Sequence, residues 1–525
     1  MSATSTIAPD AYVHRPAVLG HVTIRIQNWV VGICIFLIGF ITAYLLLTAT
    51  PALLGTDDYY HTRIAAQIIE QGRLALNFPW LPMTILSPQQ FVDHHLLYHL
   101  YLAPWSYYGG ITGVKLAQAG VIGALLVSVW SLLRFMNVRF AVLWSLLLFG
   151  VSVPFLYRSL MIRTQAAAVL LILIALQLLF RERYLWLIVV AFAFTWLYNG
   201  FIILPVIVAL YVASTWVTDR KFIWQPLALV LAGVVLGLVI NPYFPQNITF
   251  IIDHLGEKVD IESGVRVGSE WYPYTTEALM TNSAGALIIL GLGFFGAGLS
   301  TRKRDRMETT LLLVAFLTLY MVFKSRRFIE YFPAFALVYG AAALGRGQVQ
   351  LSDFVPSFLS RRRIIRVTAV MLALLPAGYL VSSTMGAAQA DIQQVEGLAQ
   401  FEGASRWLQA HTEPGEMIFQ TDWDDFTRLF YYNTYNAYLV GLDPTYLQVA
   451  DPSVWNLWVA ITRGQVDLPS SIITETFGAR YVVSDTKHGD FARAADNDPN
   501  MHMVYRDANS MIWQITTAPV TTGMP

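Results

Sequence analysis

The stretch "NWVVGICIFLIGFITAYLLLTATPALLGTDDYYHTR", residues 28–63, joins a long apolar run directly to a compact polar group. A helix needs about 20 apolar residues to cross a bilayer, and this run is long enough. It is also too long for the apolar region of a signal peptide, so we expect a retained membrane anchor. The stretch therefore predicts a membrane span whose end carries two adjacent carboxylates, Asp57 and Asp58.

The composition of the whole chain agrees with a membrane protein. The chain has 525 residues, of which 56% are hydrophobic and only 13% are charged. A soluble globular domain usually carries about 25% charged residues. The single cysteine, Cys34, excludes an intrachain disulfide framework and a cysteine metal site. The net charge of zero gives no reason to expect a nucleic-acid partner.

Further apolar windows follow the first, and together they predict a polytopic α-helical membrane protein with about eleven transmembrane helices. The windows are 29–54, 111–134, 140–157, 165–180, 184–199, 201–217, 226–242, 283–300, 309–323, 329–345 and 367–386.

Charge predicts the orientation. The basic clusters "TRKRDR" (301–306) and "SRRRIIR" (360–366) fall on the same side as the N-terminus, and the positive-inside rule places that side in the cytoplasm. We therefore expect a cytoplasmic segment 1–28, a transmembrane domain 29–386 with outer loops 55–110 and 243–282, and an extracytoplasmic domain 387–525. The protein would be a multi-pass protein of the plasma membrane.

The last segment changes in composition. It becomes polar, and short β-type runs alternate with helical stretches such as "EGASRWLQAH" (402–411). The runs are "GEMIFQT" (415–421), "NAYLVGL" (436–442), "ARYVVSD" (479–485) and "SMIWQITT" (510–517). This pattern predicts a C-terminal extracytoplasmic α/β domain.

The first outer loop begins with "DDYYHTRIAAQIIEQG" (57–72), which reads as a helix ended by Gly72. Its apolar face suggests that it lies along the membrane interface. Two interpretations of Asp57 remain open. It caps this helix and pairs with Arg63, or it belongs to a catalytic site at the membrane face.

The same loop contains a group of histidines. Asp93, His94 and His95 are consecutive, and His99 lies one helical turn beyond His95. Carboxylate and imidazole groups suit a divalent metal, so Asp57, His94 and His95 are candidate metal ligands, with Mn²⁺ or Mg²⁺ favoured over Zn²⁺. Histidines also occur at interfaces without a ligand role.

Two segments place basic residues on the outer side, against the positive-inside rule. These segments are "YRSLMIRTQ" (157–165) and "MVFKSRRFIEYFPAF" (321–335). Their basic residues are Arg158, Arg163, Lys324, Arg326 and Arg327. They could pair with the outer acids, but guanidinium groups also suit phosphate oxygens, and we favour a phosphate site.

At this point the motifs resemble those of the GT-C class of membrane glycosyltransferases. "DDYYHTR" is similar to the first-loop motif of oligosaccharyltransferase catalytic subunits and to that of the protein O-mannosyltransferase and aminoarabinose transferase branch. Both alignments place Asp57 at the catalytic aspartate. "SEWYP" (269–273) resembles an outer-loop motif with a functional glutamate, which falls on Glu270. "TDWDDFTRLFYYN" (421–433) resembles the acceptor-reading motif at Trp423 and Asp424.

Two departures from the oligosaccharyltransferase pattern matter. The second outer loop has arginines where that group has an acidic pair for its metal, and the acceptor-reading motif matches at only two positions. These departures weigh against N-glycosylation of peptides and leave sugar transfer as the expected activity.

The resemblance implies an inverting glycosyltransferase (EC 2.4 class) that moves a sugar from a polyprenyl phosphate or diphosphate carrier to an extracytoplasmic protein, lipid or glycan acceptor. The residues and the resemblance together give these candidate site residues: Asp57, Asp58 and Glu270 for catalysis, Arg158, Arg163, Lys324, Arg326, Arg327, Tyr59 and Tyr60 for the substrate and its phosphate, and Trp423, Asp424 and Asp425 for the acceptor.

Other functions stay open. One alternative is an oligosaccharyltransferase-like enzyme that glycosylates proteins. Another, from a different class, is a multi-span transporter or a non-catalytic envelope protein. Transporters, however, tend to place charges near the bilayer midplane and to contain inverted repeats, and no repeat is visible in this sequence.

Overall fold

A computed structural model describes residues 17–256, 269–299, 303–346, 362–395 and 397–516. Three sets of predicted features lie partly outside these ranges: the cytoplasmic segment 1–28, the outer loop 243–282 and the two basic clusters.

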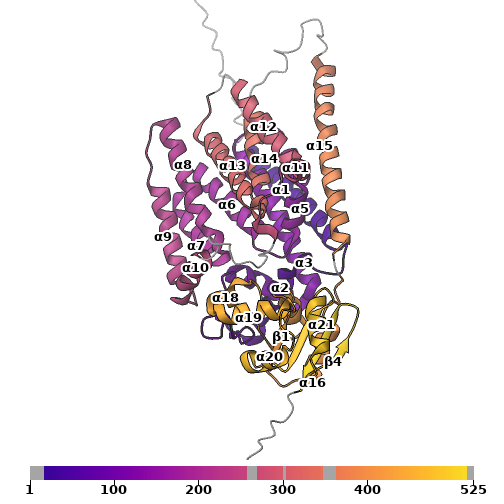
Figure 1. The fold of residues 1–525 in the computed structure, drawn as a ribbon. Helices are drawn as coiled ribbons and strands as arrows, with labels where there is room; N and C mark the ends of the chain where they lie inside the picture. The colour runs from indigo at the N-terminus through magenta and orange to yellow at the C-terminus, as the bar shows by residue number, and fades with distance from the viewer. Residues whose placement is uncertain (1–16, 257–268, 300–302, 347–361, 396, 517–525) are drawn as a thin grey trace, which may run out of the picture.

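A helix occupies each of the eleven apolar windows. The helices are α1 (Ala17–Leu47), α3 (Leu96–Phe135), α4 (Ala141–Leu146) with α5 (Val153–Leu160), α6 (Gln165–Phe180), α7 (Leu187–Leu197), α8 (Ile203–Asp219), α9 (Gln225–Val239), α12 (Ala284–Leu299), α13 (Arg306–Lys324), α14 (Phe332–Gly345) and α15 (Arg362–Gln393). They form one elongated helical layer (Figure 1). Within the described residues, four helices are long and apolar enough to cross a membrane, or six if two bent pairs each form one span. The chain is thus a multi-pass membrane protein, and the count of about eleven spans stays a prediction.

The two bent pairs are joined to each other. The helical stretch Ala141–Gly150 meets α5 at 88°, and α11 (Thr276–Asn282) meets α12 at 84°. The prediction of a single helix over 140–157 is therefore wrong, because the Ser152 hydroxyl accepts a hydrogen bond from Phe155 N–H and starts a new helix. Ser152 Oγ lies 2.8 Å from Ser283 Oγ, so the break before α5 contacts the break before α12.

The C-terminal residues form a mixed five-stranded sheet in the order β2-β1-β3-β5-β4. Strand β1 (Met417–Gln420) is parallel to β2 (Ala437–Tyr438) and to β3 (Tyr481–Asp485), whereas β5 (Ser510–Ile515) is antiparallel to β3 and to β4 (Met501–Arg506). Four strands fall in the four predicted β-type runs, and β4 was not predicted. The helices around the sheet are α16 (Glu402–His411), α17 (Phe426–Tyr432), α18 (Thr445–Ala450), α19 (Pro452–Thr462), α20 (Ser470–Phe477) and α21 (Gly489–Asn497).

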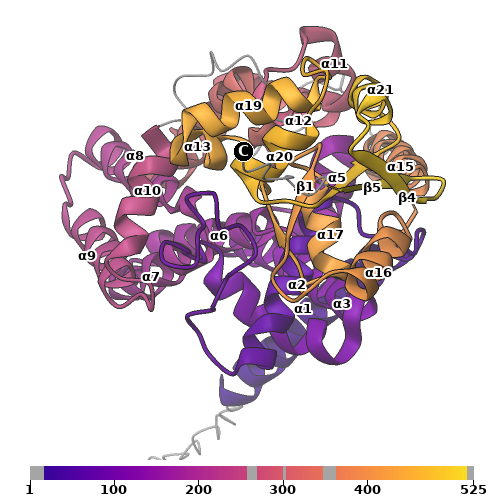
Figure 2. The ribbon, with the colours of Figure 1, turned by 60° about the horizontal axis from the view of Figure 1, so that its bottom comes forward.

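The first outer loop and the C-terminal residues share one apolar core. Helix α2 (Thr56–Gln71) lies beside α17, and Figure 2 shows this contact from the sheet side. Trp80 Nε1 donates a hydrogen bond to Thr434 O at 2.8 Å, and Tyr438 N–H donates one to Trp80 O at 2.8 Å. Ile64 on the apolar face of α2 is fully buried in the same core. The prediction that this face lies along the membrane interface is wrong, because the C-terminal residues cover it.

Candidate active site

The start of α2 separates the roles of the two adjacent aspartates. Asp58 Oδ2 accepts a hydrogen bond from Gly55 N–H at 3.1 Å, so Asp58 and not Asp57 stabilises the first turn. Arg63 forms its ion pair with Glu70 at 2.7 Å, not with Asp57. The interpretation in which Asp57 caps this helix and pairs with Arg63 is therefore wrong. The Asp57 side chain is one-third exposed and contacts Arg163, which belongs to the segment 157–165.

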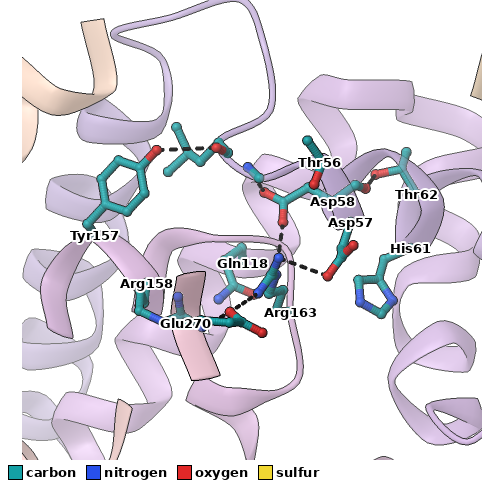
Figure 3. Close-up of polar contacts among 12 residues, drawn as sticks. Thr56, Asp57, Asp58, His61, Thr62, Gln118, Tyr157, Arg158, Arg163 and Glu270 are labelled. Atoms are coloured by element: carbon teal, nitrogen blue, oxygen red, sulfur yellow. Dashed lines mark hydrogen bonds and ion pairs between the residues drawn. The ribbon is translucent and has the colours of Figure 1, made fainter. Parts of the chain in front are cut away.

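Arg163 connects three acids from two distant segments (Figure 3). Its NH2 atom lies 2.8 Å from Asp57 Oδ2, and its NH1 atom lies 3.3 Å from Glu270 Oε2. Its Nε atom lies 3.9 Å from Asp58 Oδ1. Arg163 occupies the short linker between α5 and α6, and Glu270 belongs to the short helix η5 (Ser269–Trp271).

Two more arginines extend this group. Arg158, at the end of α5, contacts Glu270 Oε2 at 2.8 Å and Glu330 Oε1 at 2.6 Å. Arg327 in η6 (Arg326–Glu330) lies 3.5 Å from Glu270 Oε1, and its guanidinium stacks on Trp271. We call the set of Asp57, Glu270, Glu330, Arg158, Arg163 and Arg327 the arginine–carboxylate cluster. The structure thus brings acids and arginines from four separate segments together.

The electrostatic environment differs among the nearby acids. Burial alone would raise the pKa of Glu270, but Arg327, Arg163 and Arg158 together lower that pKa well below its ordinary value. Burial raises the pKa of Asp58 to about 6, although Arg163 opposes the shift. Glu270 is therefore held ionised, whereas Asp58 titrates close to neutral pH.

The other predicted substrate contacts lie outside the cluster. Arg326 bonds to the backbone oxygens of Tyr272 and Pro273, both at 3.2 Å, and Lys324 is exposed with its ammonium over the Tyr320 ring. Tyr59 and Tyr60 are buried in the packing between α2 and α17, where they contact Tyr431 and Phe430. Packing in the core therefore explains the presence of these two tyrosines, and no contact with a substrate is needed to explain it.

The predicted acceptor motif lies next to Asp57. Thr56 Oγ1 donates a hydrogen bond to Asp424 Oδ1 at 2.9 Å, which joins the start of α2 to the segment before α17. Burial raises the pKa of Asp424 to about 6, and the charge of Asp57 contributes to the shift. Asp425 is buried and Trp423 is half-buried against the sheet. Of the three predicted acceptor residues, Asp424 is the one linked to the arginine–carboxylate cluster, through its hydrogen bond to Thr56 and the charge of Asp57.

The histidines assemble differently from the prediction. Among the described residues, one group of possible ligands has all its ligand atoms within 4.8 Å of one another, and it consists of His61, His95 and His99. Asp57 and His94 are not part of it. We call it the histidine trio. Burial lowers the pKa of His61 and of His95 well below the ordinary value, so both are neutral near pH 7.

The donor set around Asp57 does not fit a divalent metal. Asp57 and Glu270 contact Arg163, and Glu270 also contacts Arg158 and Arg327. A metal ion there would face three guanidinium groups at close range, which like-charge repulsion disfavours. The acidic pair that the resemblance associates with a metal is replaced by arginines in this chain.

An apolar groove adjoins the cluster. It has a volume of about 340 Å³ and lies between α8 and α13. Its lining residues are Tyr198, Asn199, Gly200, Ile202, Ile203, Val206, Leu317, Met321, Phe328 and Tyr331. Ile202 and Val206 are more than 40% exposed, so the groove opens on the exposed surface of the helical layer. Phe328 follows Arg327 directly, and Tyr198 interacts with the Arg327 guanidinium.

Sequence reasoning missed several contributors. Glu330 was noticed only as part of a basic segment, and its pairing with Arg158 depends on tertiary contact. Thr56 had no signal in the sequence. His99 was noticed but not named as a ligand, although His95 and His99 lie four residues apart at the start of a helix, a spacing typical of metal ligands. His61 lies in α2, outside that pattern.

No protein-family model matches the chain, and no curated protein matches it in sequence. Solved structures do match. The apo oligosaccharyltransferase of Archaeoglobus fulgidus superposes with a TM-score of 0.62 at 16% identity, over 94% of this chain and 75% of that one. ArnT from Cupriavidus metallidurans bound to undecaprenyl phosphate matches with a TM-score of 0.56 at 14% identity, over 93% and 98%.

A third similar structure is the arabinofuranosyltransferase AftD from Mycobacteria, with a TM-score of 0.55 at 15% identity over 92% of this chain and 40% of that one. All three are membrane glycosyltransferases of the GT-C class. The predicted GT-C-like fold is therefore confirmed.

Proposed function

We propose that this protein, which has the GT-C fold, is an inverting glycosyltransferase that moves a sugar from a polyprenyl phosphate or diphosphate carrier to an acceptor outside the membrane. The observation that supports this function best is the arginine–carboxylate cluster, in which Arg163 lies 2.8 Å from Asp57 and 3.3 Å from Glu270. This arrangement offers both a base and an anion-binding group at one point.

The arginines would stabilise the leaving phosphate. Arg163 Nε and Arg327 Nε are buried and have no hydrogen-bond partner among the described residues, so both can still donate. Charge-assisted bonds from preorganised donors in a site shielded from water stabilise developing negative charge strongly. Two similar structures, one of ArnT and one of the Archaeoglobus fulgidus enzyme, contain undecaprenyl phosphate and dolichol-phosphate respectively.

The apolar groove would hold the isoprenoid chain of the donor. Two of its lining residues adjoin Arg327, since Tyr198 interacts with the Arg327 guanidinium and Phe328 follows Arg327 in the chain. A lipid lying in it would therefore place its phosphate at the guanidinium groups. Its sugar would then project toward Asp57.

Asp57 would accept the proton of the acceptor. In a single displacement, the acceptor oxygen forms a bond to the anomeric carbon while the bond from that carbon to the phosphate oxygen breaks. The acceptor proton moves to the Asp57 carboxylate, and the phosphate keeps the bonding electron pair. Asp57 suits this role better than Asp58, since its side chain is one-third exposed while that of Asp58 is fully buried. Asp424, joined to α2 through Thr56, would contact the acceptor.

We also propose the membrane topology that the charges favour. Segment 1–28 would be cytoplasmic, 29–386 would form the transmembrane domain, and 387–525 would lie outside the plasma membrane. The cluster would then face the outer side of the membrane, where a lipid-linked sugar exposes its anomeric carbon.

Donor binding and transfer test the proposal with a matched pair of arginines. The protein would be reconstituted in liposomes with radiolabelled undecaprenyl-phosphate and undecaprenyl-diphosphate sugars and a cell-envelope acceptor fraction. We expect labelled product, with transfer lost in Arg327→Ala and kept in Arg326→Ala, because of these two arginines only Arg327 contacts Glu270. Native mass spectrometry should show bound undecaprenyl phosphate in wild type and Arg326→Ala. Absence of both binding and transfer in wild type, or equal loss in the two variants, would contradict the proposal.

A further inference from the structure

The histidine trio joins the two helices that frame the first outer loop. His61 belongs to α2, His95 precedes the first residue of α3, and His99 lies in the first turn of α3. His61 and His99 are almost fully buried. Three imidazoles therefore converge from two helices at a place that water reaches poorly.

A buried carboxylate orients one of these rings. Both carboxylate oxygens of Asp93 lie 2.8 Å from His99 Nδ1, and the Asp93 side chain is only 1% exposed. His99 Nδ1–H therefore donates to Asp93, which leaves Nε2 with its lone pair directed at His61. A carboxylate that fixes the far nitrogen of a histidine is the usual second layer of a zinc site.

The remaining nitrogens are incompletely satisfied. His61 Nδ1 lies 2.7 Å from His99 Nε2, so these two atoms share one proton. His95 Nδ1 is buried and has no hydrogen-bond partner in the part of the chain that the structure describes. A hydrogen-bond network alone would explain the first pair but would leave His95 Nδ1 unsatisfied, which is costly for a buried polar atom.

We propose that the histidine trio binds a Zn²⁺ ion, with an exchangeable fourth position. In a tetrahedral zinc site the ligand nitrogens lie about 3.3 Å apart, since each Zn–N bond is about 2.0–2.1 Å. His61 and His99 would separate by a few tenths of an ångström, and His95 would move inward. Zn²⁺ would replace the shared proton, and His61 would carry its proton on Nε2. Three neutral imidazoles without thiolates favour zinc over Mn²⁺ or Mg²⁺, which prefer oxygen ligands.

The consequence for the fold would be a fixed first outer loop. His61 lies one helical turn after Asp57 on α2, so a metal that ties α2 to α3 would also hold Asp57 in position. The proposal is independent of the sugar-transfer function, because it rests on the histidines and Asp93 alone.

Metal content tests the proposal directly. The full-length protein would be purified in detergent with a tag that contains no histidine, equilibrated with ZnCl₂ against a chelator buffer, and measured by elemental mass spectrometry. We expect one Zn²⁺ per chain. Replacement of His61, His95 or His99 by alanine should each remove most of it, and Asp93→Asn should weaken affinity about 10- to 100-fold. Co²⁺ in place of Zn²⁺ should give the visible absorption of a tetrahedral site.

The matched controls are His94→Gln and Asp57→Asn, which alter residues outside the trio and should keep wild-type zinc binding. Thermal unfolding of the wild-type protein with Zn²⁺ and with chelator gives a readout that needs no variant to fold, and Zn²⁺ should raise the melting temperature. Fewer than about one zinc ion per ten chains, or full zinc in the trio variants, would overturn the proposal. Loss of zinc in a control variant would overturn this choice of ligands.

Discussion

Ion pairs occur at both ends of the helical layer, and the two ends are built differently. At the end predicted to be cytoplasmic, Arg346 pairs with Asp305 at 2.6 Å, and Arg306 contacts Glu182 and lies 3.6 Å from Asp219. These acids are 34–56% exposed. Water can screen such pairs, and they contribute little to stability.

At the opposite end, the arginine–carboxylate cluster is more buried and its members are shared. Glu330 is only 3% exposed, and one acid, Glu270, contacts three arginines. Buried charges are costly to hold and persist where the arrangement is well satisfied or useful. In this protein, the burial of the charged side chains and the sharing of their partners distinguish the two ends. Four substitutions test this difference between the two ends.

The largest effect is expected for Asp57→Asn. It keeps the shape of the side chain but removes the proposed proton acceptor, so the transfer rate should fall by about 10²- to 10⁴-fold. Undecaprenyl-phosphate binding, measured by native mass spectrometry, should change little, because the arginines remain. A variant that retains full transfer would show that Asp57 is not the base.

Glu330→Gln should lower the stability of the end of the helical layer that carries the arginine–carboxylate cluster. Glu330 contacts Arg158 at 2.6 Å in a buried setting, and loss of one partner of a buried pair typically costs about 3–5 kcal/mol. Glu270 also contacts Arg158, so we expect the lower end of that range. Denaturant unfolding in detergent measures the change, and an unfolding free energy equal to that of wild type would mean that Glu270 alone satisfies Arg158.

Asp58→Asn should change the pH dependence of stability. The folded pKa of Asp58 is about 6, above its ordinary value of 3.8. The folded state therefore binds this proton more tightly than the unfolded state. The stabilising contribution is fully present below about pH 4 and is lost as pH rises through about 6, a change on the order of 3 kcal/mol. Asparagine cannot titrate, so melting temperatures of the variant between pH 4 and 7 should fall less steeply. An unchanged slope would assign the effect to another group, such as Asp424.

The smallest effect is expected for Glu182→Gln, the matched change at the opposite end. Glu182 is 56% exposed, so the free energy of unfolding should change by no more than about 1 kcal/mol. Sugar transfer should be unaffected. A loss as large as that of Glu330→Gln would remove the distinction between the two ends.

The sequence predicted the helices well because long apolar windows depend only on local composition. It predicted Arg158, Arg163 and Arg327 as site residues because these basic residues lie on the outer side, against the positive-inside rule. It predicted Asp57 and Glu270 because their motifs resemble those of GT-C glycosyltransferases. The structure brings these five residues together.

Which residues contact one another could not be predicted from the sequence. The side of α2 that reads as interfacial is covered by α17, more than 350 residues later in the chain, and Asp58 rather than Asp57 satisfies Gly55 N–H. Arg326 and Arg327 are adjacent and chemically identical, yet only Arg327 contacts Glu270. These outcomes depend on tertiary contacts between distant segments, which local patterns do not contain.

The shared core of the first outer loop and the C-terminal residues limits how such proteins can diversify. Phe78 and Trp80 are buried together with Phe430, and the backbone of Trp80 is bonded to Tyr438. A chimera that took its C-terminal part from a relative would leave these rings facing a surface that does not match them. Under the proposed function, new acceptor preferences should therefore arise by point changes around Asp424 rather than by exchange of whole modules.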